Sequence, residues 1–154
     1  MSLVKCYIEI EKDSNIKYEF DKVQNKLVVD RILNEPFHYP YAYGFIPGTL
    51  AKDNDELDVL IITNMKVNID TNINGYIIGG IIMEDEKGMD EKIFIVPTYE
   101  YKYLYDINLM DMNVVEKICE FFANYKKDDD NKWSKVHGLL TKQEAIMLYN
   151  SSKI

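Results

Sequence analysis

The chain of 154 residues has little cysteine, histidine or arginine, and each scarcity excludes a kind of structure or site. Cys6 and Cys119 are too few for a disulfide framework or a thiolate metal site, so we expect buried free thiols in a reducing compartment. His38 and His137 stand alone and are expected to form ordinary hydrogen bonds or face solvent. Because zinc and copper sites recruit these two residue types, such a centre is not expected.

Long apolar runs are also missing. The longest, such as Tyr76–Met83, are far shorter than the roughly 20 residues that a membrane-spanning helix needs. The N-terminus reads MSLVKCYIEIEK and lacks the basic region, apolar core and cleavage site of a secretory signal. We therefore expect a cytoplasmic protein with no membrane partner. The length and an ordinary 47% hydrophobic content favour one globular domain, residues 1–154.

The net charge of −8 limits the ligands that the chain can bind. Nucleic acid is not expected as a partner, because its recognition depends on Lys and Arg that neutralise phosphates. An acidic protein that binds an anionic phosphate compound needs metal ions to reverse the local sign of the potential.

The hydrophobic pattern predicts an α+β fold, in which strands precede helices. Strands are expected at 4–11, 16–20, 26–33, 57–63, 75–83 and 92–96, with a bulge or bend at Gly79-Gly80. A helical period predicts the main helix at about 113–126, and Thr141-x-x-Glu144 predicts a capping box for a short second helix. We expect the strands to curl into a small antiparallel barrel.

Carboxylates are spaced in a way that predicts a site for hard divalent cations. Residues 39–60, YPYAYGFIPGTLAKDNDELDVL, carry three aspartates as D-x-D-x-x-D just before an apolar strand. Such a run is most often a solvated turn. Other carboxylates, however, lie at the end of another buried strand or on the faces of other strands. If the barrel closes, they converge on one cavity, where carboxylate oxygens suit Mg²⁺. The set is Asp53, Asp55, Asp58, Asp85, Glu86, Asp90, Glu9 and Glu19.

Other acidic and phosphate-binding motifs do not match. Counting Asp53 as the first position of an EF-hand puts Asp58 where glycine is required. The D-x-D of aspartate-nucleophile phosphatases directly follows an apolar strand, whereas Asp53 follows TLAK. Neither a glycine-rich phosphate loop nor a serine-centred nucleophile elbow is present.

Basic and phenolic side chains supply donors of the kind that bind phosphate oxygens. Arg31, the single arginine, is expected on an otherwise apolar strand face, which is unusual unless it meets an anion. Taken singly, a lysine is more typical of a solvated surface and a tyrosine of the core or rim. The candidates are Lys17, Arg31, Lys92, Lys126, Tyr39, Tyr43 and Tyr125.

Together these segments resemble the soluble family I inorganic pyrophosphatases over about residues 8–148. The resemblance is carried by IEIEK, IKYEFD, LVVDR, YPYAYGFIPGTL, DNDELDVL, MEDEKGMDEK, FFANYK and KWSKVHG, in the family's order and nearly its spacing. The most specific element is D-x-D-x-x-D-V-L after Y-x-x-x-Y-G-F-I-P. It implies an OB-like five-stranded barrel with flanking helices and Mg²⁺-dependent hydrolysis of inorganic diphosphate to two phosphates.

The resemblance also implies a role for each site residue. Asp55 would be the general base that takes a proton from the attacking water. The implied metal ligands, for several Mg²⁺ ions that Mn²⁺ or other divalent ions can replace, are Asp53, Asp58, Asp85 and Asp90. The implied substrate-binding residues are Lys17, Arg31, Tyr43, Tyr125 and Lys126. The implied supporting residues are Glu9, Glu19, Tyr39, Glu86 and Lys92. A homo-oligomer is implied, as in the hexamers of bacterial-type relatives.

Four residues depart from the family pattern without touching an implied ligand. Asn54 and Glu56 stand where the family usually has Gly and Pro, Ala42 replaces an Asn or similar residue, and Leu139 replaces a common second tryptophan. Because Asn tolerates left-handed backbone angles, we expect the turn at Asn54 to survive. The effects fall on metal affinity and on the oligomeric interface.

Two other functions fit part of this pattern. An OB-like module that binds a phosphorylated or nucleic-acid ligand without hydrolysis would suit the aromatic content, but the net charge and the carboxylates oppose it. A hydrolase of nucleotides or other phosphoanhydrides would prefer those compounds over diphosphate. Phosphate release from diphosphate, with and without Mg²⁺, separates the three functions.

Overall fold

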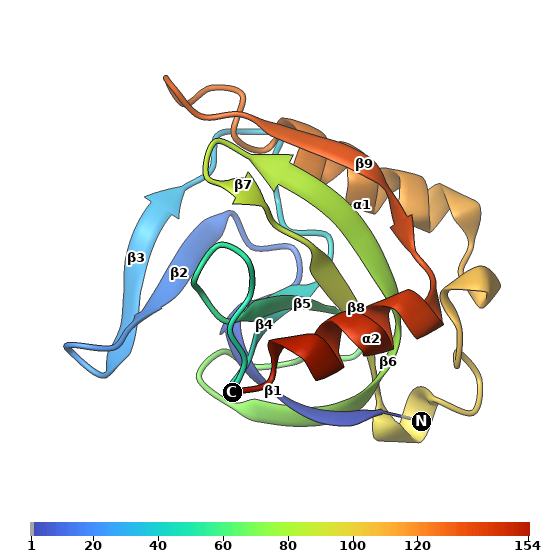
Figure 1. The fold of residues 1–154 in the computed structure, drawn as a ribbon. Helices are drawn as coiled ribbons and strands as arrows, with labels where there is room; N and C mark the ends of the chain where they lie inside the picture. Colours follow the sequence, from blue (N-terminus) through green and yellow to red (C-terminus); the bar gives the residue numbers. More distant parts are fainter. Residues whose placement is uncertain (1) are drawn as a thin grey trace.

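The structure is a computed structural model that describes residues 2–154 (Figure 1). Its strands are β1 Leu3–Ile10, β2 Ile16–Asp21, β3 Lys26–Ile32, β4 Ala42–Ile46, β5 Leu57–Ile61, β6 Asn72–Asp85, β7 Gly88–Met89, β8 Lys92–Pro97 and β9 Ser134–Leu140. Its helices are the 3₁₀ turns η1 Thr98–Glu100 and η2 Ile107–Leu109 and the α-helices α1 Met112–Asn124 and α2 Lys142–Ser152. Every helix in the described part of the chain is too short or too polar to span a membrane.

Five strands close into a barrel in the order β1-β4-β5-β8-β6, and β6 pairs with β1 to complete the ring. The prediction of an OB-like five-stranded α+β barrel is confirmed, but the antiparallel description was wrong at one pair. β5 and β8 are parallel, from Asp58 opposite Lys92 to Ile61 opposite Ile95. A closed ring with an odd number of strands cannot alternate direction throughout, so one parallel pair is unavoidable.

The two strands at this parallel pair are buried on both faces, as their continuous apolar runs predicted. Val59, Ile61 and Ile93 pack in the cluster that α2 covers through Ala145. The alternate residues of the same strands, with Leu60 among them, pack in the second cluster, which α1 covers. Figure 1 shows the two helices on different sides of the barrel. These two strands are therefore packed on both faces by side chains of the core.

β6 is the longest strand and bends where glycines were expected to bend it. Its register against β8 shifts between Ile77 and Gly79, and Gly79 has φ of 154°. A Cβ on Gly79 would lie 2.6 Å from Ile107 Cβ, so a side chain cannot be accommodated there. The bend lets one strand pair with β1 near its start and with β7 and β9 near its end.

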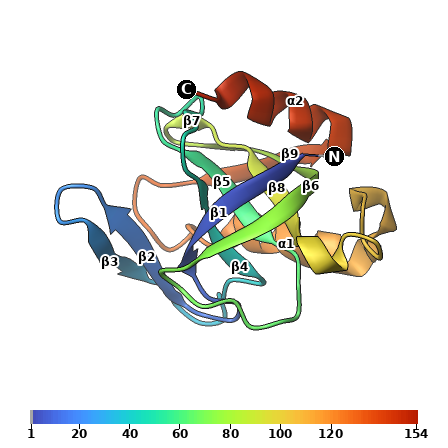
Figure 2. The same ribbon diagram turned by 90° about the horizontal axis from the view of Figure 1, so that it is seen from below.

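β2 and β3 form a separate two-stranded sheet that stands away from the barrel (Figures 1 and 2). One attachment is a hydrogen bond from the Phe20 backbone N–H to Glu9 Oε2 on β1, at 2.8 Å. Arg31 and Lys17 lie directly opposite each other on this hairpin. The hairpin therefore carries two predicted substrate-binding cations as a unit.

Both predicted α-helices are present. Asp111 caps α1 by accepting from Asn113 N, and the main helix ends at Asn124, within two residues of the predicted boundaries. Thr141 and Glu144 form the expected capping box of α2. Cys119 on α1 is only half-buried, so the expectation that both thiols are buried was wrong for this residue.

Three strands were not predicted, namely β4, β9 and the two-residue β7. β4 lies in the aromatic, Gly- and Pro-rich stretch between the strands predicted at 26–33 and 57–63. β9 includes Lys135 and Gly138, and its residues alternate between partly buried and exposed up to the buried Leu140. It becomes a strand by pairing with the far end of β6, which its own pattern does not reveal.

Candidate active site

An open cavity of about 430 Å³ lies between the barrel, the β2–β3 hairpin and the loop before β5. Fourteen of the fifteen predicted site residues line it. These are Glu9, Lys17, Glu19, Arg31, Tyr43, Asp53, Asp55, Asp58, Asp85, Glu86, Asp90, Lys92, Tyr125 and Lys126. The exception is Tyr39, which is 1% exposed and packs behind the cavity, with its ring centroid 4.8 Å from that of Phe121.

The loop before β5 presents its carboxylates through a tight turn. Ala51 N donates to Asp55 O at 2.7 Å, and Asp55 N donates to Asp53 Oδ1 at 3.2 Å. Asn54 lies between them with φ of 66°, which confirms that it can replace glycine in this turn. Asp58 follows on β5 itself, so the barrel wall fixes its position.

Lys92 joins three of the groups in the cavity. Its side chain is 2% exposed, and Nζ donates to Tyr43 Oη at 2.7 Å, Asp58 Oδ2 at 2.9 Å and Asp90 Oδ2 at 2.8 Å. Burial alone would lower the pKa of Lys92, but Asp58 and Asp90 raise it well above its ordinary value. A charged ammonium therefore holds two predicted metal ligands together.

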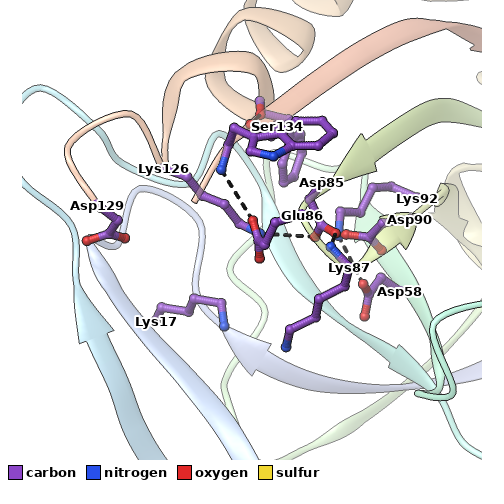
Figure 3. A network of polar contacts seen from close by, with 12 residues as sticks. Lys17, Asp58, Asp85, Glu86, Lys87, Asp90, Lys92, Lys126, Asp129 and Ser134 are labelled. Atoms are coloured by element: carbon purple, nitrogen blue, oxygen red, sulfur yellow. Dashed lines mark hydrogen bonds and ion pairs between the residues drawn. The ribbon is translucent and has the colours of Figure 1, made fainter. Parts of the chain in front are cut away.

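Lys126 likewise pairs with two acidic residues, on the other side of the cavity from Lys92 (Figure 3). Its Nζ lies 3.0 Å from Asp85 Oδ2 and 3.6 Å from Glu86 Oε2. Lys126 lies two residues after the end of α1, and the two acids lie at the end of β6 and in the turn after it. The contact therefore joins elements about 40 residues apart in the chain.

Carboxylates also hold the two cations of the hairpin. Lys17 Nζ lies 2.5 Å from Asp30 Oδ2, and Arg31 forms an ion pair with Asp129. Arg31 Nε is buried and has no hydrogen-bond partner in the described residues. Burial opposes the ionisation of Asp30, but Lys17 and Arg31 hold its pKa below the ordinary value. The guanidinium thus retains an unused donor next to the cavity.

Several acidic groups are harder to ionise than usual. Burial raises the pKa of Glu9 to about 8, although the Phe20 N–H opposes the shift. Burial raises the pKa of Asp58 to about 7 against the effect of Lys92. Burial and Glu56 raise the pKa of Asp55 to about 6. Asp90, buried beside the same Lys92, is held below its ordinary pKa. Burial is therefore the largest cause of the raised pKa values of Glu9, Asp55 and Asp58.

Two of the three tyrosines that line the cavity, Tyr43 and Tyr125, are hydrogen-bond donors at neutral pH. Burial raises the pKa of Tyr125 to about 12 and that of Tyr43 well above its ordinary value. Both hydroxyl groups therefore keep their protons, which suits them to bind an anion.

Eight lining residues were not predicted: Tyr18, Phe20, Lys22, Asp30, Phe45, Glu56, Lys87 and Lys132. Most lie inside segments that carried the family resemblance, such as Asp30 in LVVDR and Lys87 in MEDEKGMDEK. Their position within those segments was the signal in the sequence that could have identified them as cavity residues. Lys22, at the hairpin turn, lies outside every such segment.

The donor set fits hard divalent cations. Ten acidic and seven basic residues line the cavity, so carboxylates remain in excess after every cation is paired. The lining residues include neither His nor Cys, which suits Mg²⁺ rather than zinc or copper. In the arrangement of residues 2–154, no three acidic, His or Cys side chains surround one point closely enough to hold an ion. Lys92 and Lys126 pair with four of the carboxylates instead.

Comparison with known proteins gives one consistent family. The family described as inorganic pyrophosphatase matches residues 6–153. Inorganic pyrophosphatase of Helicobacter pylori is 41% identical over 143 residues, covering 90% of this chain and 83% of the relative. That of Nanoarchaeum equitans is 43% identical over 146 residues, covering 92% and 90%.

Solved structures agree with the sequence comparison. The Helicobacter pylori inorganic pyrophosphatase structure has a TM-score of 0.94 and 37% identity, covering 98% of this chain and 91% of that chain. The Thermus thermophilus inorganic pyrophosphatase structure has a TM-score of 0.93 and 32% identity, covering 97% and 88%.

Proposed function

Because the chain belongs to the inorganic pyrophosphatase family, and is thus a hydrolase acting on diphosphate, we propose that it hydrolyses diphosphate in this cavity with Mg²⁺ as cofactor and Asp55 as general base. The observation that supports this most is the convergence of fourteen predicted residues, from segments spread over the chain, on one cavity. Because the family is one of hydrolases, the alternative of a module that binds phosphate ligands without hydrolysis is not favoured.

Binding of the substrate is proposed to use groups on opposite sides of the cavity. Lys17 and Arg31 on the hairpin and Lys126 after α1 supply positive charge, and the Tyr43 and Tyr125 hydroxyls donate hydrogen bonds. Arg31 Nε has no protein partner to lose when it binds a phosphoryl oxygen. These groups orient the diphosphate and stabilise charge on the phosphoryl group in a loose, in-line transition state.

The cations are proposed to bind to Asp53, Asp58, Asp85 and Asp90, with Glu9, Glu19 and Glu86 in support. When bound, Mg²⁺ would neutralise phosphoryl oxygens and make the attacking water more acidic. Asp58 and Asp90 would then contact Mg²⁺ in place of the Lys92 ammonium. The ammonium would remain beside the Tyr43 hydroxyl group. Carboxylate oxygens at the ends of two neighbouring strands suit such an exchange.

Asp55 is proposed to accept the proton of the attacking water. Its side chain lines the cavity between Asp53 and Asp58 but makes no ion pair with a cation in the described residues. A carboxylate free of a cation keeps its basicity, as a proton acceptor requires. The expected homo-oligomer, the absence of a nucleic-acid partner and a cytoplasmic location remain predictions.

The test is phosphate release from diphosphate by the purified protein. We expect turnover that rises with Mg²⁺, stops in excess chelator and resumes in part with Mn²⁺. ATP and sugar nucleotides serve as competing substrates at equal concentration. A protein that releases no phosphate at any Mg²⁺ concentration, or that prefers the nucleotides, would contradict the proposal.

A further inference from the structure

Seven basic residues line the cavity, and five of them are already paired with carboxylates. The pairs are Lys17 with Asp30, Lys22 with Glu56, Arg31 with Asp129, Lys92 with Asp58 and Asp90, and Lys126 with Asp85 and Glu86. Each of these cations must share its charge when an anion enters. The two others, Lys87 and Lys132, form no ion pair within the described residues.

Of these two lysines, Lys87 has less negative charge near its ammonium group. Lys132 lies close enough to Asp30 to contribute to the lowered pKa of that carboxyl group, so it faces a carboxylate. No carboxylate of residues 2–154 lies within ion-pair distance of Lys87. Figure 3 shows the Lys87 side chain extending from its turn into the space on the side of Lys17. It is thus a free ammonium directed into the cavity.

The backbone around Lys87 is well fixed. Asp85 lies opposite Gly88 where β6 pairs with β7, so Glu86 and Lys87 are the two turn residues. The Lys87 N–H donates to Asp85 Oδ1 at 2.9 Å, and Gly88 has φ of 118°, which a glycine adopts without strain. The turn depends on Gly88, on the Lys87 backbone N–H and on the Asp85 carboxylate. A substitution that changes only the Lys87 side chain should therefore leave the turn intact.

We propose that Lys87 is a further substrate-binding residue, whose ammonium donates to a phosphoryl oxygen of the diphosphate and of the product phosphate. This inference rests on the proposed function of the cavity. Neither the carboxylate ligands nor the cations implied by the family resemblance include this position. An anion gains the full attraction of an unpaired ammonium, whereas a paired lysine must first give up part of its carboxylate contact.

The expected effect is on binding rather than on the chemical step. Lys87 lies at a turn on the cavity rim and its side chain is exposed, so its charge-assisted contact is weaker than a buried one. We expect Lys87→Met to raise KM for diphosphate about three- to tenfold and to change kcat by less than about twofold. The apparent affinity for inorganic phosphate as an inhibitor should fall by a similar factor.

The experiment compares Lys87→Met and Lys87→Gln with two references. Lys87→Arg keeps the charge and should restore KM to within about twofold of the wild type. Lys66→Met removes the same charge from an exposed loop residue outside the cavity, and controls for net charge. KM is measured at low and high salt, since losing a direct charge contact should reduce its salt dependence. Thermal unfolding midpoints verify that each variant is folded.

Binding of inorganic phosphate, followed by calorimetry in the presence of Mg²⁺, gives a second readout that needs no turnover. If the wild type binds phosphate but does not hydrolyse diphosphate, the proposed function fails while the role of Lys87 is still measured. The inference is overturned if both neutral variants keep wild-type KM and phosphate affinity. It is also overturned if Lys66→Met shows the same loss.

Discussion

Lys22 Nζ lies 2.7 Å from Glu56 Oε1, and this ion pair joins the turn of the β2–β3 hairpin to the loop that carries Asp53 and Asp55. The hairpin supplies phosphate-binding cations and the loop supplies carboxylates, so the pair links the two halves of the site across the cavity. Glu56 stands where the resembling family usually has proline. An ion pair, rather than a rigid ring, constrains this loop.

We predict that breaking this link weakens substrate binding without changing the chemical step. Lys22→Met and Glu56→Gln should each raise KM for diphosphate about two- to threefold, because the hairpin and the loop lose a fixed separation. The double variant should be no worse than either single variant if the two residues act only through each other. Steady-state kinetics on the four proteins measure this. Additive losses would show that the residues act independently.

Asp55→Asn should reduce kcat by at least about 10²-fold, the low end for losing a general base. The substitution keeps the shape of the side chain and the turn around Asn54, so the fold should be retained. Phosphate release under saturating Mg²⁺ and diphosphate measures the loss, and far-UV circular dichroism verifies the fold. A near-normal rate would remove Asp55 from the role of base.

Asp58→Asn should raise the Mg²⁺ concentration required for half-maximal activity by at least about tenfold, because a neutral amide binds the cation much less well than a carboxylate. A Mg²⁺ titration of activity measures the shift. Asp106→Asn is the matched control, since Asp106 caps η2 away from the cavity and asparagine also caps helices. An unchanged titration for Asp58→Asn would count against its role as a ligand.

We predict that the buried Glu9 makes the stability of the metal-free protein depend on pH. Its pKa rises from 4.5 to about 8 on folding, so the native state holds a proton that the unfolded chain has released. Its contribution is fully present below pH 4.5 and is lost as the pH rises through about 8, with a slope of up to about 1.4 kcal/mol per pH unit. Glu9→Gln should remove this part of the slope.

Urea unfolding in excess chelator, at intervals from pH 5 to pH 9, measures the stability curve for Glu9→Gln. Glu116→Gln is the matched control, because Glu116 is exposed on α1 and lies outside the cavity. The control should follow the wild-type curve. If Glu9→Gln follows it too, the burial of Glu9 does not affect stability as stated.

Local patterns predicted the elements whose stability is local. The capping box at Thr141 and Glu144, the bend at Gly79 and the turn at Asn54 depend on residues close in sequence, and all are present. β9 could not be predicted in this way. Its half-exposed residues become ordered by pairing with the end of β6, about 50 residues earlier in the chain.

The site shows the same division. The motif residues indicated which side chains belong together, but not which of them pair. Nothing in the spacing of Lys92, Asp58 and Asp90 predicts that one buried ammonium holds both carboxylates. That arrangement follows from the parallel β5–β8 pair, which places Lys92 directly opposite Asp58.

The sequence by itself determined the acidic character, the α+β class, the family and fourteen of the residues that line the cavity, because these depend on composition, periodicity and ordered motifs. Only the tertiary structure decided which cations are paired, and so that Lys87 is left without a carboxylate while Lys22 holds Glu56. Ion pairing depends on distances of a few ångströms between segments far apart in the chain, and barrel closure sets those distances.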